Sequence, residues 1–229
     1  LFKVWTFNNT RTDYFQQQVP GKYTYPTALS HFRALSSKVI SEIIEDKADV
    51  TLSSEYRKLL SINQINDLSQ AAITALFAQL KQNLAKEDFS SLSSNALAKM
   101  LSALNSVAGS WAGDGTNSWL WDITAEQVSQ LSAEAGFQLY KAWTNDNKYF
   151  KYATKDLSGK YTDQIVATQF RALSADVINA IVENKYSYGL RKEYQELLSF
   201  NQIKGLSKQA LNTIYPSIKS QTLTKSEVQ

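Results

Sequence analysis

The single histidine, His31, is the residue with the widest chemical range, since imidazole serves as general base, proton shuttle and metal ligand. The sequence contains no cysteine that could act with this histidine, which excludes thiolate nucleophiles and cysteine-based zinc sites. His31 stands at the glutamine position of a helix-start pattern, and Gln169 takes that position where the surrounding sequence recurs. We therefore interpret His31 as a helix-start residue. We expect no catalytic residue, no metal site and no cofactor, and predict that the chain is not an enzyme.

The acidic side chains lead to the same expectation. Their densest group is Glu42, Glu45, Asp46 and Asp49, of which only Glu45 has an acidic counterpart, Glu183, in the recurring sequence. A general acid–base pair needs two carboxylates that converge in a cleft. Nothing in the sequence brings two together, so this group is interpreted as a solvated helix end.

A tryptophan-rich segment, residues 106–122, has the composition of a binding loop. It holds three of the five tryptophans and three of the eight glycines, and Asp114-Gly115 between its tryptophan-bearing arms predicts a β-hairpin. Aromatic anchors beside polar groups are typical of surfaces that bind carbohydrate or protein. The alternative is a plug that fills a gap between helical units. The candidate binding residues here are Trp111, Asp114, Asn117, Trp119 and Trp121.

Two tyrosine-rich insertions, residues 6–27 and 144–164, correspond to each other in the sequence. Pro20-Gly21 suits the centre of a type II turn, so a short hairpin is expected in the first. Tyrosines beside such a loop can stack on sugars or peptides, since each offers apolar area with a polar tip. They can equally pack over helix ends. The candidate binding residues are Tyr14, Tyr23, Tyr25, Tyr152 and Tyr161.

These insertions belong to an internal duplication of the chain. When the sequence is aligned on itself so that Phe32 matches Phe170, 22 of the 45 positions from Phe32 to Leu76 are identical without a gap. The match predicts a first full repeat copy at 1–138 and a second, truncated copy at 139–229. We expect the chain to be part of a longer tandem-repeat protein.

Each copy contains a recurring nine-residue phrase: Ser/Thr, two residues, Gln/Glu, Ile/Val/Phe, two residues, Leu and Ser. It is clearest at residues 61–69, 124–132 and 199–207, with looser versions at 28–36, 85–93 and 166–174. Its first four residues predict a capping box, and its final serine predicts the N-cap of the next helix. Apolar residues follow that serine at helical spacing. Each phrase therefore predicts a short helix followed by a longer amphipathic one.

The composition fits helices better than strands. The chain has 8 glycines and 3 prolines in 229 residues. Together they make about 5%, well below the usual background of about 12%. We predict an all-α fold: a helical-repeat, solenoid-like array of short capped helix pairs, with small loop or β-hairpin insertions. The net charge of +3 and the dispersed lysines predict no nucleic-acid partner. The sequence contains no apolar run of about 18 residues, so we predict no transmembrane segment.

The phrase resembles the degenerate helical repeats of large bacterial surface and secreted proteins, without pointing to a named family. The resemblance implies a non-enzymatic spacer, adhesion or protein-binding module, extracellular or at the cell surface. Its expected partners are a protein or a glycan, together with neighbouring repeats of the same chain. Two alternatives remain open: an intracellular scaffold or effector that binds a partner protein, and a carbohydrate-binding module that uses the tryptophan-rich loop.

Overall fold

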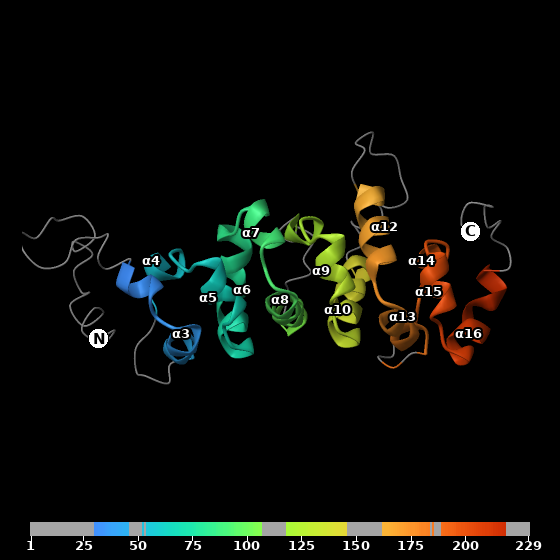
Figure 1. Ribbon diagram of the computed structural model, residues 1–229, viewed down its shortest axis with the longest axis horizontal. Coiled ribbons are helices and arrows are strands. Elements are labelled where there is room, and N and C mark those ends of the chain that lie inside the picture. The colour runs from blue at the N-terminus through green and yellow to red at the C-terminus, as the bar shows by residue number, and fades with distance from the viewer. Residues whose placement is uncertain are drawn as a thin grey trace, which may run out of the picture. The chain divides into compact units, whose positions relative to one another are not determined.

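The computed structural model describes residues 30–45, 52, 54–106, 118–145, 162–183, 185 and 189–218. These residues form helices and the turns between them, with no β-strand among them, so the predicted all-α class is confirmed for this part of the chain. The chain divides into two compact units, Leu1–Asn83 and Leu84–Gln229, whose boundary falls between α6 and α7 (Figure 1). Each unit is described by itself.

The described helices of the first unit are two longer ones, α3 and α6, with two short ones between them. They are α3 (Ser37–Ile44), α4 (Ser54–Arg57), α5 (Ile62–Asn66) and α6 (Gln70–Asn83), preceded by a helical turn at 30–33. α5 begins at the predicted capping box: the amide of Gln64 donates to Ser61 Oγ, and the amide of Ser61 donates to Gln64 Oε1. The reciprocal bonds satisfy two donors that the helix itself leaves unpaired.

The core of the first unit lies where α3 packs against α6. The apolar stripe of α3 places Ile40 in this core, fully buried, and α6 contributes Ile73 and Leu76. Phe32 from the preceding turn is also fully buried, and its ring lies 5.1 Å from that of Tyr56 on α4. The predicted serine caps precede both long helices, with Ser36 before α3 and Ser69 before α6.

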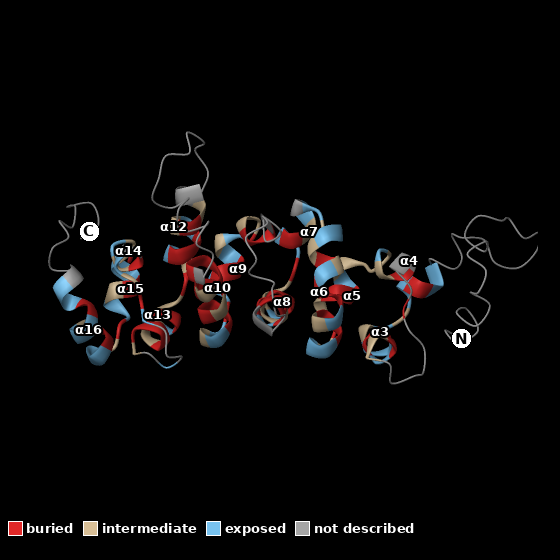
Figure 2. Ribbon diagram, turned by 180° about the vertical axis from the view of Figure 1, so that it is seen from behind, coloured by how far each residue is buried: buried red, intermediate tan, exposed pale blue. Residues whose placement is uncertain are grey.

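The second unit holds the remaining described helices. They are α7 (Lys86–Ser90), α8 (Ser94–Ser106), the 3₁₀ helix η2 (Ser118–Trp121), α9 (Ala125–Ser129), α10 (Ala133–Asn145), α12 (Thr162–Ala172), α13 (Ala175–Val182), α14 (Lys192–Gln195), α15 (Phe200–Lys204) and α16 (Lys208–Ile218). Four of its helices pack in chain order, α8 against α10, α10 against α13 and α13 against α16, whereas α12 packs against α9 (Figure 1). The position in this series affects burial: α13, which packs between α10 and α16, is mostly buried, whereas α16 has a largely exposed surface (Figure 2).

α10 and α13 approach each other closely at Gly136. A Cβ atom on this glycine would lie 2.7 Å from Cγ2 of Val177 and 3.2 Å from Cδ2 of Leu173. Carbon atoms that are not bonded to each other do not come as close as the first of these contacts, so the packing of α13 on α10 requires a residue without a side chain at position 136.

Two local expectations differ from the structure. The predicted hairpin of the tryptophan-rich loop has no second strand, because residues 118–121 form the 3₁₀ helix η2; its tip lies outside the described residues. The phrase at 166–174 predicts a helix start, but α12 runs through it without a break from Thr162. Val166 carries no side-chain oxygen that could cap a helix.

Among the described residues, no single helix is long and apolar enough to cross a membrane; one bent pair, Ile165–Ala172 with Ala175–Val182, meets the length and composition limits only when its two helices are joined.

Candidate functional site

Of the ten residues predicted to bind a ligand, the structure describes two. Trp119 is buried, with 2% of its surface exposed, and its ring stacks on that of Phe89 at 5.6 Å and 20°. Trp121 is half-buried. The other eight lie outside the described residues: Trp111, Asp114, Asn117, Tyr14, Tyr23, Tyr25, Tyr152 and Tyr161. Trp119 therefore follows the packing alternative, because a ligand has no access to its ring.

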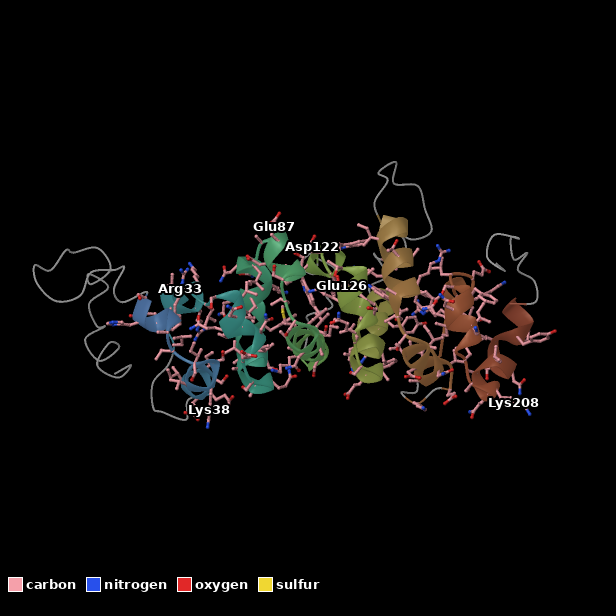
Figure 3. The ribbon with its side chains drawn as sticks, viewed as in Figure 1. Arg33, Lys38, Glu87, Asp122, Glu126 and Lys208 are labelled. Atoms are coloured by element: carbon pink, nitrogen blue, oxygen red, sulfur yellow. The ribbon has the colours of Figure 1, made fainter. Side chains whose placement is uncertain are left out.

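The groups with acid–base or metal-binding chemistry do not converge in the described part of the chain. His31 is exposed in the turn before α3. Glu87 on α7 and Glu126 on α9 are exposed side chains (Figure 3). No three histidine or acidic residues in the described ranges come close enough to hold a metal ion. A shallow depression on α16 is open to solvent; it is lined by Lys208, Gln209, Asn212 and Thr213.

Most of the buried polar side chains among the described residues lie instead at the junctions between successive helix pairs. The best defined is the contact we call the glutamine bridge: a buried glutamine whose Nε2 donates to two main-chain carbonyls at the end of an earlier helix. Gln202 donates to the carbonyls of Phe170 (2.8 Å) and Leu173 (2.9 Å). Gln64, its counterpart in the first copy, donates to Phe32 (3.0 Å) and Leu35 (3.2 Å).

Two further glutamine bridges lie in the second unit. Gln127 donates to the carbonyls of Phe89 (2.9 Å) and Leu92 (2.8 Å). Gln169 donates to those of Leu120 (2.9 Å) and Ile123 (2.7 Å). All four glutamines are buried, with 2–7% of their surface exposed. The last carbonyls of a helix have no intrahelical i→i+4 partner. Those of Phe32, Phe89 and Phe170 each accept the main-chain amide three residues on, and the bridge gives each a second donor.

The bridge explains why this position holds an amide. The sequence pattern treats glutamine and glutamate alike, because either can accept the cap amide through an oxygen. Only the amide also has N–H donors for the carbonyls of the earlier helix. Gln169 shows the two roles separated: it lies in mid-helix without a capping partner, its buried Oε1 has no hydrogen-bond partner among the described residues, and its Nε2 still forms the bridge.

The bridge of Gln169 also reveals a phrase that the sequence search missed. Leu120 and Ile123 accept this bridge just as Phe170 and Leu173 accept that of Gln202. Residues 116–124 thus fit the phrase, with Thr at both ends, Trp119 at the glutamine position, and Leu and Ile at the apolar positions. A signal was present in the spacing of its apolar residues and closing threonine, but tryptophan in place of glutamine concealed it.

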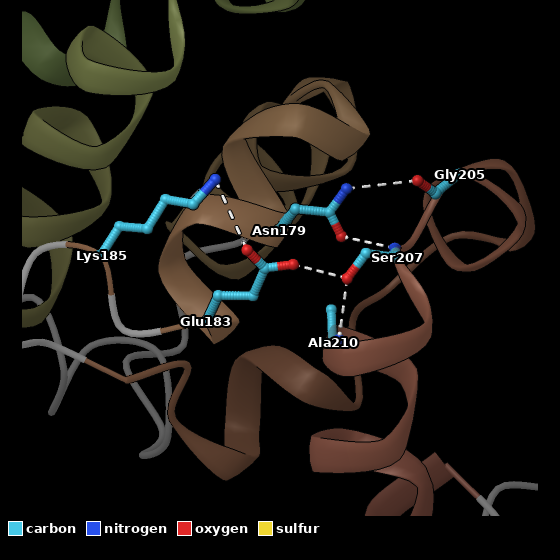
Figure 4. Close-up of polar contacts among 6 residues, drawn as sticks. All are labelled: Asn179, Glu183, Lys185, Gly205, Ser207 and Ala210. Carbon is cyan, nitrogen blue, oxygen red and sulfur yellow. Dashed lines mark hydrogen bonds and ion pairs between the residues drawn. The ribbon is translucent and has the colours of Figure 1, made fainter.

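A second polar junction joins consecutive long helices. Ser207, the residue before α16, donates its amide to Asn179 Oδ1 at 2.9 Å and its hydroxyl to Glu183 Oε1 at 2.5 Å (Figure 4). The same hydroxyl accepts the amide of Ala210 at 3.0 Å, which caps the helix. Asn179 Nδ2 donates to the carbonyl of Gly205 at 3.3 Å. The end of α13 is thereby attached to the start of α16.

The hydroxyl of Ser207 holds the pKa of the Glu183 carboxyl below its ordinary value, because the bond favours the charged form. Partial burial opposes this shift, and Lys185, whose Nζ lies 3.4 Å from Glu183 Oε2, adds to it. Residue Glu183 is therefore a charged member of the junction.

The first copy contains the corresponding junction. Ser69, before α6, donates its amide to Ser41 Oγ at 2.9 Å and its hydroxyl to Glu45 Oε1. This corrects the expectation of a solvated helix end at Glu45, which is half-buried and serves as an acceptor between α3 and α6. The sequence hint was the identity of Glu45 and Glu183 across the two copies. Its meaning depended on a serine 24 residues away in the chain.

A third contact is preserved although its residue differs between the copies. Arg57 Nε donates to the carbonyl of Leu52 at 2.8 Å, and Gln195 Nε2 donates to the carbonyl of Leu190 at 2.8 Å. The two pairs occupy equivalent positions of the two sequence copies. Because both side chains carry N–H donors, either residue can hold the loop before α4 or α14.

Comparison with known proteins adds no further constraint on the function. The chain matches no protein-family model, and neither a curated protein nor a solved structure matches it. The described site is therefore defined by its own chemistry: buried amides and serine caps that fix helices to one another at repeated junctions. Such an arrangement can position surface loops.

Proposed function

We propose that this chain is a non-enzymatic tandem-repeat module of a larger, surface-exposed or secreted protein, and that it acts as a spacer and protein-binding scaffold. The observation that carries the proposal is the glutamine bridge, which occurs at four junctions and at matched positions of the two sequence copies, Gln64 and Gln202. Repetition of one junction is what a repeat array requires, since each unit gains its stability from its neighbours.

In this function the helices form a solenoid-like array that carries the insertions. Each bridge restricts the rotation of one helix pair relative to the next, because its hydrogen bonds join the two pairs. Each such bond contributes about 1 kcal/mol to stability. The serine junctions fix the long helices in the same way, at Ser69 and Ser207. The tyrosine-rich and tryptophan-rich segments then meet the partner from a rigid base, where binding loops lose little entropy.

The carbohydrate-binding alternative has less support, because Trp119 belongs to the core of the second unit. The remaining support for carbohydrate binding comes from the candidate tryptophan and tyrosine residues that lie outside the described part of the chain.

Rigidity within the second unit provides the test. The chain has no cysteine, so two introduced cysteines give unique sites for spin labels. Glu126 and Lys204 are exposed and suit this purpose. Pulsed electron-spin resonance is expected to give one narrow distance distribution, which broadens in Gln169→Met because that bridge is lost. The exposed Gln209→Glu is the matched control and leaves the distribution narrow. A broad distribution in the parent chain would contradict the spacer.

A separate measurement tests partner binding. Replacing residues 107–117 by a Gly-Ser linker of equal length removes the loop and leaves the described helices. Under the proposal, capture of a defined protein or glycan ligand is lost while the thermal unfolding midpoint is retained. Unchanged capture would remove this loop from the binding surface.

A further inference from the structure

The outer face of α16 differs from the equivalent faces of the other long helices. Counted from the N-cap serine, the residues three and seven positions on are Ala210 and Ile214, and both are buried where α16 packs on α13. The residues four and eight positions on are Leu211, which is half-buried, and Tyr215, which is 59% exposed. Residues four apart share one face of a helix, so the half-buried Leu211 and the exposed Tyr215 together form a partly exposed apolar surface.

The same two positions are buried in the long helices that have neighbours on both sides. In α10, between α8 and α13, they are Gly136 and Tyr140; in α13, between α10 and α16, they are Ile178 and Val182. Burial at these positions therefore accompanies a long helix that follows in the packing order, as Gly136 of α10 shows by facing Val177 of α13. An exposed tyrosine at the equivalent place of α16 marks a flank that such a helix would cover.

We propose that the face of α16 formed by Leu211 and Tyr215 is the docking surface for an amphipathic helix of the α8 type, supplied by a further repeat unit. This inference rests on the proposed tandem-repeat function. It names the contact through which one repeat unit joins the next. The expected partner helix opens with the phrase's closing serine and presents a continuous apolar stripe.

The order of the repeat identifies the occupant. The counterpart of α16 in the first sequence copy is α6, and the next long helix along the chain after α6 is α8. The helices α8, α10, α13 and α16 of the second unit pack in chain order. The stripe of α8 fits an apolar face, since its residues are fully buried: Ala96, Leu97, Met100, Leu101 and Leu104. A tyrosine suits the edge of such a contact, with its ring covered and its hydroxyl in water.

A second copy of this chain, docked through α3, fits the face less well. α3 exposes Val39 at 38%, and the counterpart of Val39 is Val177, which packs on α10 only because Gly136 has no side chain. The position of α16 that corresponds to Gly136 of α10 holds Leu211. A helix of the α3 type would therefore meet a bulky side chain where it needs a glycine.

The test extends the full chain by its own sequence. At the C-terminus, residues 224–229 resemble 85–90, so residues 91–106 appended after Gln229 continue the phrase into a helix of the α8 type. Hydroxyl-radical footprinting is expected to show a several-fold lower labelling of Tyr215 in the extended chain. The matched control carries aspartate at the appended copies of Ala96 and Met100, the residues three and seven positions after the appended Ser93, and its Tyr215 is labelled as in the parent.

Stability gives an independent readout. Tyr215→Lys is expected to leave the urea midpoint of the parent chain unchanged, because the side chain is exposed, and to abolish the gain that the extension gives. Unchanged labelling of Tyr215 and no gain in the extended chain would overturn the proposal. So would concentration-dependent protection of Tyr215 in the unextended chain together with dimers in sedimentation, which would make a second copy the occupant.

The two proposals fail in different ways. The distance between labels at Glu126 and Lys204 is measured in the unextended chain, so it reports on the spacer alone. A narrow distribution there with no docking of the extension would reject the α16 surface and keep the repeat module. A broad distribution would reject the module itself.

Discussion

The side-chain amide of Gln202 donates to the main-chain carbonyl of Phe170, 2.8 Å away and 32 residues earlier in the chain. Gln64 and Phe32 form the same bond at 3.0 Å with the same separation. Each glutamine also belongs to a local capping box, so one side chain starts its own helix through oxygen and attaches that helix to an earlier one through nitrogen. Local and long-range structure thereby depend on a single amide.

The first prediction separates these two roles. Gln202→Glu keeps the oxygen that accepts the amide of Ser199 but places a buried carboxylate against the carbonyls of Phe170 and Leu173. We expect a loss of about 3 kcal/mol in the free energy of unfolding at neutral pH, from missing donors and desolvated charge. Urea denaturation measures it. Gln209→Glu on the exposed face of α16 is the control and changes little.

The pH dependence of this variant gives a second check. Burial raises the pKa of the introduced carboxyl above its ordinary value, and the protonated form regains one O–H donor. The folded state then binds the proton more tightly than the unfolded state, so the deficit shrinks as the pH falls. A deficit that stays constant down to acidic pH would show that the carbonyl contacts are not its cause.

The second prediction concerns the junction of Glu183 and Ser207. Because the Ser207 hydroxyl lowers the pKa of Glu183, the folded chain favours the carboxylate more than the unfolded chain does. This stabilisation is complete above the ordinary glutamate pKa of about 4.3 and is lost as the pH falls through the lower folded value. The difference in unfolding free energy between the parent and Glu183→Gln should therefore be flat at neutral pH and decline in acid.

Ser207→Ala provides the partner measurement, since it removes the N-cap of α16 and the donor to Glu183 together. Loss of an N-cap costs about 1 kcal/mol. The acid-dependent part of the parent's stability should also be smaller in this variant. An unchanged acid profile in Ser207→Ala would remove the hydroxyl as the source of the shift.

The third prediction tests the close approach of α10 and α13. Gly136→Ala introduces a methyl group 2.7 Å from Val177, so a loss of about 2 kcal/mol is expected from overpacking. Gly189→Ala is the matched control, because nothing lies within 4 Å of a Cβ there. The double variant Gly136→Ala, Val177→Ala should recover part of the loss. Equal thermal midpoints for the two single variants would contradict the packing.

The fourth prediction assigns Trp119 to stability. Trp119→Ala removes a buried ring that stacks on Phe89, and we expect a loss of about 3–5 kcal/mol. Trp121→Ala, at a half-buried ring two residues on, should cost less. Chemical denaturation checks both. Lost glycan binding at unchanged stability in Trp119→Ala would instead place this ring at a ligand surface.

The sequence predicts much of the local structure, because caps and helical stripes depend on neighbouring residues. The residue spacing predicts the serine caps, the capping boxes and the buried stripes that follow them. The caps are at Ser36, Ser69 and Ser174, and the capping boxes begin at Ser61 and Thr124. Thr124 could be assigned from its own phrase alone.

The contacts between phrases were not predictable in this way. Glutamine and glutamate serve equally as the acceptor of a cap, so the pattern gave no reason to ask for the donor of Gln127 or Gln169. Their partners lie 35 to 49 residues away and are main-chain atoms, which carry no sequence signature. The candidate binding site had the same weakness: composition marked Trp119, and only the fold shows that its ring is covered.

The glutamine bridge ends on carbonyl oxygens, which every residue possesses. It is formed with Phe170 and Leu173 by Gln202, and with Leu120 and Ile123 by Gln169. A substitution in the receiving helix therefore needs no matching change in the donor. Helix pairs joined in this manner can therefore keep their joint while the side chains of the receiving helix vary, as they do between Phe170 and Leu120.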